Sequence, residues 1–200
     1  AKRIARAEGL KFGGLMTYPP VGGQERVQSF MSQAKALIEA ASIPVQRITT
    51  GGTPDMMTAD RSPIATEFRP GTYIYNDRSL VMRGVCAWDD CALAVHTTVV
   101  SVPAPNRAVI DAGGKSLTSD LLGLTGYGHV LGRDDIVIDQ LSEEHGRLVS
   151  EGPINLQVGD RLRIIPNHAC VVTNMTDYVY IVSAGQPVQT WPVVARGRVL

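Results

Sequence analysis

The sequence predicts a chain of two parts, an α/β part over residues 1–70 and an all-β part over residues 71–200. Residues 23–41 have the apolar period of one long helix between two strand-like runs, which indicates a strand–helix–strand unit. Beyond residue 70, short strand-like runs alternate with Gly, Pro, Asn and Asp, as in an antiparallel β-barrel or sandwich. The break at Arg69-Pro70-Gly71 separates the two patterns, so we place the boundary there.

The first part is expected to begin with the end of a helix. Residues 1–8 are mostly good helix formers without an N-cap residue, and Gly9 is a typical helix stop. The sequence has no initiating Met. We therefore expect the chain to be a carboxy-terminal piece of a longer protein.

A strand, a helix and a second strand follow in that order. Residues 11–18 form an apolar run that stops at Pro19-Pro20, and residues 43–50 predict the next strand. The apolar residues between these runs have helical spacing, which predicts a core-facing stripe and not a cofactor-binding motif. They are Val27, Phe30, Met31, Ala34, Leu37, Ile38 and Ala41. Short connections imply that the two strands are parallel, with a right-handed crossover between them.

The second part contains a series of candidate strands. They are residues 72–75, 93–102, 107–110, 136–139, 161–165, 169–172, 178–182 and 187–194. Asn76-Asp77 and Gly159-Asp160 are turn signals between some of these runs. Closely spaced short strands with such turns favour antiparallel pairing.

Composition excludes several classes of partner. Lys plus Arg and Asp plus Glu number 19 each and the pI is about 7.1, so we expect neither a nucleic acid nor a membrane surface as partner. No apolar run approaches the roughly 18 residues that a membrane span needs. The three cysteines are an odd number, so they cannot form a complete disulfide framework. A reducing, cytoplasmic location is the simpler interpretation.

The most informative chemical pattern is His168-Ala169-Cys170, which follows the apolar run of residues 161–165. If the chain is extended there, the imidazole and the thiol two residues later project from the same face. Both groups are good zinc ligands, and two protein ligands suit an open site completed by water, substrate or another residue. The alternative is a buried Cys beside a His that caps a turn.

A second candidate is the turn Gly51-Gly52-Thr53, directly after the predicted strand that ends at Thr50. Two glycines let the backbone approach a ligand closely, and their N–H groups can converge on phosphate oxygens. The Thr50 or Thr53 hydroxyl adds a donor, and a short helix beginning near Pro54 would add a favourable partial charge. The alternative is a plain tight turn.

For the other titratable residues, the surrounding sequence favours a structural role. Glu143, Glu144 and His145 form either an acid/base cluster or a solvated turn, and we favour the turn. His96 is expected on one face of a half-buried strand. His129 is expected in a loop, because glycines surround it. Lys115 lies in a polar glycine turn without a desolvating run, so we expect a surface position.

Together these motifs resemble the carboxy-terminal half of the D-threonine aldolase and D-serine dehydratase family, which uses pyridoxal 5′-phosphate and a divalent metal. The resemblance covers essentially the whole chain, and the ordered set of motifs carries it. In order, they are Tyr18 at a strand end, Thr49-Thr50-Gly51-Gly52-Thr53-Pro54, residues 67–77 from Glu67-Phe68-Arg69 onward, residues 109–120, Ser142-Glu143-Glu144-His145-Gly146, Pro166-Asn167-His168-Ala169-Cys170 and Ala195-Arg196-Gly197.

The resemblance implies the last strands and helices of an alanine-racemase-like (β/α) barrel, followed by a β-domain. It implies that Thr50, Gly51, Gly52 and Thr53 hold the cofactor phosphate and that Tyr18 lies beside the cofactor ring. Tyr18 departs from the family pattern, since Pro19-Pro20 follows it in place of the expected glycine and histidine.

His168 and Cys170 are implied to be the metal pair. The Schiff-base lysine of the family lies early in the barrel, and no position of this sequence matches it.

Two reactions on a small D-β-hydroxy-α-amino acid fit this resemblance. A Lewis acid on the substrate hydroxyl promotes its loss as water, and a metal that lowers the hydroxyl pKa promotes retro-aldol cleavage. The Cys170 thiolate favours Zn²⁺ over Mn²⁺ or Mg²⁺. We expect dehydration of a D-serine-like substrate, since His-x-Cys resembles the dehydratase variant. A D-threonine-type aldolase and a non-catalytic fragment without the lysine are the alternatives, and a homodimer or a separate amino-terminal half is the expected protein partner.

Overall fold

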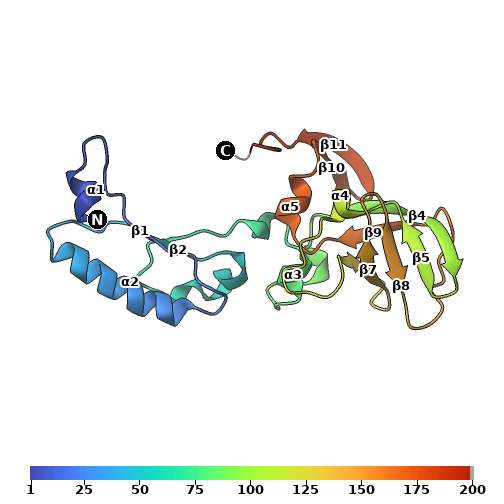
Figure 1. The fold of residues 1–200 in the computed structure, drawn as a ribbon, viewed down its shortest axis with the longest axis horizontal. Coiled ribbons are helices and arrows are strands. Elements are labelled where there is room, and N and C mark those ends of the chain that lie inside the picture. The colour runs from blue at the N-terminus through green and yellow to red at the C-terminus, as the bar shows by residue number, and fades with distance from the viewer. Residues whose placement is uncertain (199–200) are drawn as a thin grey trace. The chain divides into compact units, whose positions relative to one another are not determined.

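The computed structural model describes residues 1–198 and divides the chain into two compact units, the first from Ala1 to Tyr73 and the second from Ile74 onward (Figure 1). No helix among the described residues is long and apolar enough to cross a membrane.

The first unit has a three-stranded parallel sheet with the order β1-β2-β3. Its elements are α1 (Lys2–Arg6), β1 (Leu15–Met16), α2 (Gln24–Glu39), β2 (Ile48–Thr50), the 3-10 helix η1 (Thr53–Arg61) and β3 (Glu67–Phe68). The predicted long helix and the parallel pairing of the strands on either side of it are confirmed. The third strand, which runs directly into the boundary region, was not expected.

The core of the first unit lies between α2 and the sheet. Val27 and Met31 of α2 are buried against Val45 and Ile48. The prediction that the whole apolar stripe faces the core is wrong at Phe30, which is 67% exposed, and at Leu37, which is 76% exposed. These two residues lie together along one side of the stripe, outside the narrow line that contacts a sheet of only three short strands.

The predicted strands of the first unit are shorter in the structure because glycine interrupts the first one. Gly14 has a φ of +136°, and a Cβ atom there would collide with the carbonyl oxygen of Arg47. The backbone therefore approaches the neighbouring strand at a place where a side chain could not fit. Regular pairing starts only at Leu15.

The second unit is a curled antiparallel sheet with the order β6-β9-β4-β5-β8-β7, together with a separate ribbon of β10 and β11 (Figure 1). The outer strands contact each other, and Tyr127 N–H donates to the carbonyl of Ile138 at 3.0 Å, so the sheet nearly closes into a barrel. The strands are β4 (Val95–Ala104), β5 (Arg107–Ile110), β6 (His129–Val130), β7 (Val137–Leu141), β8 (Gly146–Val149), β9 (Arg161–Ile165), β10 (Tyr178–Ser183) and β11 (Gln186–Pro192).

Short helices connect these strands. They are the 3-10 helix η2 (Thr72–Ile74) at the boundary, α3 (Arg78–Val81), the 3-10 helix η3 (Trp88–Asp90), α4 (Gly114–Leu117) and α5 (Ala169–Thr173). The predicted strand at residues 72–75 is wrong, because η2 occupies that segment. Strand β8 was not predicted at all.

The barrel interior is filled by alternate residues of neighbouring strands. Val99, Ile110, Ile138, Leu148 and Ile164 are fully buried in one cluster. Alternation of buried and exposed positions is the pattern of strands with one face toward a core. The predicted antiparallel β-domain is therefore confirmed, in its barrel form.

The most consequential wrong element is the predicted strand at residues 169–172, which is helix α5. The helix buries Ala169 and Val172. Its first N–H group, that of Ala169, donates to Oδ2 of Asp77 at 3.0 Å. A capping carboxylate supplied from a distant part of the chain thus stabilises a helix in a segment whose β-branched residues locally favour a strand.

Asp77 caps two helices at once. Its Oδ1 atom accepts from the Ser79 hydroxyl at 2.7 Å and from Leu80 N–H at 3.2 Å at the start of α3, while Oδ2 accepts from Ala169 at the start of α5. The carboxylate is fully buried. It therefore joins the start of α3 to that of α5, whose first residue lies 92 positions after Asp77 in the sequence.

We expect Asp77→Ala to lower the free energy of unfolding by about 2–4 kcal/mol, because three donors, two of them at helix starts, lose a charged acceptor. Urea denaturation of the whole chain measures this change. Asp89→Ala is the matched control, since Asp89 is exposed on the same unit and should change stability by less than about 0.5 kcal/mol. Equal stability of the two variants would contradict the capping role.

Candidate functional site

The first candidate site lies at the carboxyl ends of β1 and β2. Thr50 ends β2 and is buried, Gly51 follows with a φ of +81°, Gly52 is extended, and Thr53 begins η1. The chain therefore turns sharply from a parallel strand into a helical segment, at the edge of the sheet where α/β folds place ligands.

Neighbouring aromatic rings leave little room for a side chain at either glycine. A Cβ atom on Gly51 would collide with the Phe68 ring, and one on Gly52 would lie 3.2 Å from the Tyr18 hydroxyl. Tyr18 is 74% exposed, so its ring stands at the surface beside the turn. The structure thus brings together all five residues that the resemblance assigns to the cofactor.

The two threonines differ in their hydrogen bonding. Thr53 Oγ1 accepts from Gly71 N–H at 3.0 Å. Thr50 Oγ1 is buried and has no hydrogen-bond partner among the described residues. A buried hydroxyl without a partner is uncommon in a folded protein and indicates a place for an oxygen-bearing ligand.

Arg69 is a residue of this site that the sequence analysis used only as a boundary signal. Its Nε donates to Thr49 Oγ1 at 2.9 Å and its Nη2 donates to the carbonyl of Thr17. The guanidinium carbon lies 5.9 Å from the centroid of the Tyr18 ring. Arg69 therefore ties the ends of β1 and β2 together, holds a positive charge beside the turn and supports the Tyr18 ring. Because β3, the strand directly before Arg69, was not predicted, the sequence pattern did not point to this role.

The second candidate site contains His168 and Cys170. His168 is the N-cap residue of α5 and has extended φ and ψ angles of −139° and 104°. Cys170 is the second residue of the helix and is exposed. The premise that both residues belong to one extended strand is wrong, because the helix begins between them.

His168 has a carboxylate partner that the sequence did not indicate. Its Nδ1 lies 2.7 Å from Oδ2 of Asp120, and both side chains are partly exposed. This hydrogen bond from His168 is the main cause that lowers the pKa of Asp120 below its ordinary value. Asp120 lies 48 positions earlier in a loop, so sequence spacing gave no signal for the contact.

The backbone beside His168 is held by a buried amide. Asn167 Nδ2 donates to the carbonyls of Gly126 at 2.8 Å and Asp120 at 3.2 Å, and Asn167 Oδ1 accepts from Arg78 Nη1 at 3.0 Å. Partial burial lowers the pKa of Arg78. The segment before α5 is therefore locked to the loop that carries Asp120.

The described residues hold no group of three or more His, Cys, Asp or Glu side chains that could bind a metal ion together. Any metal at His168 and Cys170 would thus need ligands besides these side chains, in keeping with the predicted open site.

The remaining candidates have structural roles. Lys115 lies 3.1 Å from Glu143 and 2.6 Å from Glu144, and hydrogen bonds to both raise its pKa, which is opposite to what a nucleophilic lysine requires. The expected solvated turn is therefore confirmed. His96 lies at an exposed position of β4, a strand with both buried and exposed residues, so its expected place on one face of a half-buried strand is confirmed. The predicted loop position of His129 is wrong, since it lies in β6, is 9% exposed and stacks on Trp88 with ring centroids 3.8 Å apart.

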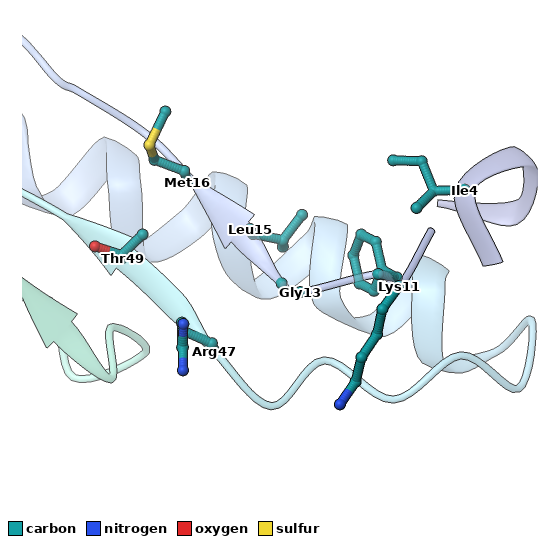
Figure 2. A pocket seen from close by; sticks show the side chains of 9 residues that line it. Ile4, Lys11, Gly13, Leu15, Met16, Arg47 and Thr49 are labelled. Atoms are coloured by element: carbon teal, nitrogen blue, oxygen red, sulfur yellow. The ribbon is translucent and has the colours of Figure 1, made fainter. Parts of the chain in front are cut away.

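A cavity of about 270 Å³ lies elsewhere in the first unit, beside α1 and β1 (Figure 2). Its lining is mostly apolar, with Lys11 and Arg47 as its charged residues. None of the residues that line it is an acid, an imidazole or a thiol. We therefore assign no reaction chemistry to this cavity.

Comparison with known proteins gives consistent relatives. A family model described as "Putative serine dehydratase domain" matches residues 92–182. The chain is 33% identical to the D-threo-3-hydroxyaspartate dehydratase of Delftia sp., over 92% of this chain and 56% of that protein. The crystal structure of D-threonine aldolase from Filomicrobium marinum superposes with a TM-score of 0.85 and 28% identity, over all of this chain and 57% of that one.

An alanine-racemase-like protein from Idiomarina loihiensis matches with a TM-score of 0.75 and 29% identity, over 92% of this chain and 56% of that one. The chain spans about half the length of the curated relatives it matches. These likenesses confirm the predicted fold class, the last strands and helices of a (β/α) barrel followed by a β-domain.

Solved structures of D-threo-3-hydroxyaspartate dehydratase include two informative variants. One has a histidine replaced by alanine, and another, described as metal-free, has a cysteine replaced by alanine. The two substituted positions are two residues apart in that protein, as His168 and Cys170 are here.

Proposed function

Because this chain belongs to the family of D-threonine aldolases and D-serine dehydratases, we propose that it carries the phosphate turn and the metal pair of a lyase that uses pyridoxal 5′-phosphate and a divalent metal. The substrate is a small D-β-hydroxy-α-amino acid, and the reaction is dehydration and deamination of a D-serine-like compound. The observation that carries the proposal is the pair His168 and Cys170, with the imidazole fixed through Nδ1.

The residues at the first site fit a phosphate. The buried Thr50 hydroxyl lacks a partner among the described residues, and Gly51 and Gly52 carry no side chain that would keep a ligand from their N–H groups. Thr50, Gly51, Gly52 and Thr53 would hold the phosphate group, and Tyr18, supported by Arg69, would lie beside the ring. When bound, pyridoxal phosphate supplies the electron sink for the carbanion at the substrate Cα.

The residues at the second site fit a soft divalent metal. His168 presents an imidazole whose Nδ1 is engaged by Asp120, which leaves Nε2 for coordination, and Cys170 adds a thiolate. A thiolate ligand favours Zn²⁺ over Mn²⁺ or Mg²⁺. With two protein side chains, the site would keep positions for water and the substrate hydroxyl, where a Lewis acid makes the hydroxyl a better leaving group.

The alternative reaction is retro-aldol cleavage, and the superposition on the D-threonine aldolase of Filomicrobium marinum favours it. Incubating the intact polypeptide with pyridoxal phosphate, Zn²⁺ and D-threonine separates the two reactions. A 2-oxo acid with ammonia supports dehydration, and glycine with acetaldehyde supports aldol cleavage. Without either product, the non-catalytic alternative holds for this chain.

Partner and location remain predictions. The chain would act as a homodimer or together with an amino-terminal half that supplies the lysine, and we expect it in the cytoplasm. We also propose that residues 1–70 carry the phosphate turn and that residues 71–200 carry the metal pair.

We expect Cys170→Ala to abolish zinc-dependent turnover of the D-amino acid while the absorbance of bound pyridoxal phosphate persists, because only the metal site loses a ligand. Zinc content by atomic absorption and turnover measure the two effects. Cys86→Ala is the matched control, since this partly buried thiol lies outside the proposed metal pair. Full zinc content and turnover in Cys170→Ala would remove the thiol from the site.

We expect Thr50→Val to weaken pyridoxal phosphate binding about 10-fold or more without lowering the stability of the cofactor-free chain, because the lost hydroxyl has no partner among the described residues. Thr66→Val is a reciprocal control. The Thr66 hydroxyl accepts from Ile48 N–H at 2.9 Å and donates to its carbonyl at 3.2 Å. Its loss should cost about 1 kcal/mol of stability and leave cofactor affinity unchanged.

Fluorescence titration gives cofactor affinity, and urea denaturation gives stability. If Thr50→Val destabilised the cofactor-free chain and bound the cofactor normally, the hydroxyl would be structural.

A further inference from the structure

We propose that Asp120 is a positioning residue, which fixes the tautomer and the ring orientation of His168 so that Nε2 is presented to the metal. The inference deepens the proposed function and rests on the metal pair of His168 and Cys170. Asp120 itself would not touch the metal or the substrate.

The contact between the two side chains determines which nitrogen carries the proton. Asp120 Oδ2 and His168 Nδ1 are 2.7 Å apart, and an ionised carboxylate only accepts hydrogen bonds. A neutral imidazole must therefore carry its proton on Nδ1, because the other tautomer would direct a lone pair at the carboxylate. This tautomer leaves the lone pair of Nε2 available for a metal.

Asp120 is itself held rigidly. Its Oδ1 accepts from Leu122 N–H at 3.2 Å, and its carbonyl accepts from Asn167 Nδ2 at 3.2 Å. Thr118 and Leu122, on either side of it, have φ angles of 62° and 46°, in the left-handed region that non-glycine residues seldom adopt. Such conformations persist where surrounding contacts impose them, and they concentrate at functional sites.

The backbone of His168 is held by contacts that do not involve Asp120's side chain. Asn167 is buried and bonded to Gly126 and Arg78, and Asp77 caps the helix that begins at Ala169. Removing the Asp120 carboxylate should therefore free the imidazole ring while the segment that carries it stays in place.

Two variants separate position from charge. Asp120→Ala removes both the acceptor and the charge. Asp120→Asn removes the charge and keeps one oxygen, which can accept from Nδ1 once it gives up the bond from Leu122 N–H. A positioning role predicts that Asn restores the tautomer and part of the metal affinity, whereas a purely electrostatic role predicts that Asn behaves like Ala.

The first experiment reads the tautomer without any metal. Long-range ¹H–¹⁵N correlation spectra of the full chain, recorded at a pH where the imidazole is neutral, distinguish protonation at Nδ1 from protonation at Nε2. We expect Nδ1–H in the native chain and in Asp120→Asn, and a mixture dominated by Nε2–H in Asp120→Ala. A native chain with Nε2–H, or an Ala variant that keeps Nδ1–H, overturns the proposal.

The second experiment titrates each chain with Co²⁺ and follows the thiolate-to-metal absorption that Cys170→Ala removes, which separates coordination by Cys170 from any by Cys86 and Cys91. We expect the dissociation constant to rise 10- to 100-fold in Asp120→Ala, the usual effect of losing the carboxylate partner of a ligating histidine. It should rise less in Asp120→Asn and stay unchanged in Asp89→Ala. Equal affinity of the native and Ala chains overturns the proposal.

The two readouts distinguish this inference from the proposed function. If the native chain shows no thiolate absorption with Co²⁺, the metal pair is wrong and with it the proposed lyase mechanism. The positioning role would then also fail as a metal-related role, even if the tautomer depended on Asp120. If the native chain binds Co²⁺ and Asp120→Ala binds equally well, the metal pair stands and only the role of Asp120 fails.

Discussion

The buried carboxylate of Asp77 is the contact on which the geometry of the second unit depends. One oxygen caps α3, and the other accepts the first N–H group of α5. Burying a carboxylate costs free energy unless hydrogen-bond donors surround it. The folded chain is therefore most stable in the arrangement in which both helix starts donate to Asp77. This arrangement makes His168 the N-cap residue of α5, where the backbone is extended and not yet helical.

Local sequence patterns predicted the helices and strands in which apolar residues recur at a regular spacing. The period of α2 and the alternation in β4, β5 and β9 identified those elements almost to the residue. Helix α5 could not be identified in this way, because Val171 and Val172 favour a strand and its cap comes from Asp77, 92 positions away. Strand β8 was missed for a related reason, since Glu143 and Glu144 before it gave a turn signal that extended over its first residue.

The chemistry of the candidate sites was predictable from residue type, but their supporting contacts were not. His168, Cys170 and the Gly51-Gly52 turn stand out in sequence because few structural roles require those residues together. Asp120 and Arg69 are ordinary charged residues whose partners lie about fifty positions away, and only the fold pairs them with His168 and Tyr18. The prediction that His168 and Cys170 are metal ligands started from an extended conformation that the structure does not contain, so the pair stays a prediction.

The buried polar groups around α5 differ in their hydrogen bonding from the Thr50 hydroxyl at the proposed phosphate turn. Around α5, the Asp77 carboxylate, the Asn167 amide and the Asp120 carboxylate are all engaged with other parts of the chain. The buried Thr50 hydroxyl is not, within the described residues. Leaving a buried hydroxyl unpaired costs about 1–3 kcal/mol, which a ligand oxygen can recover on binding. On this proposal, a phosphate bound at the turn would recover free energy that the fold does not use, whereas a metal at His168 and Cys170 would gain affinity from contacts that the fold has already formed.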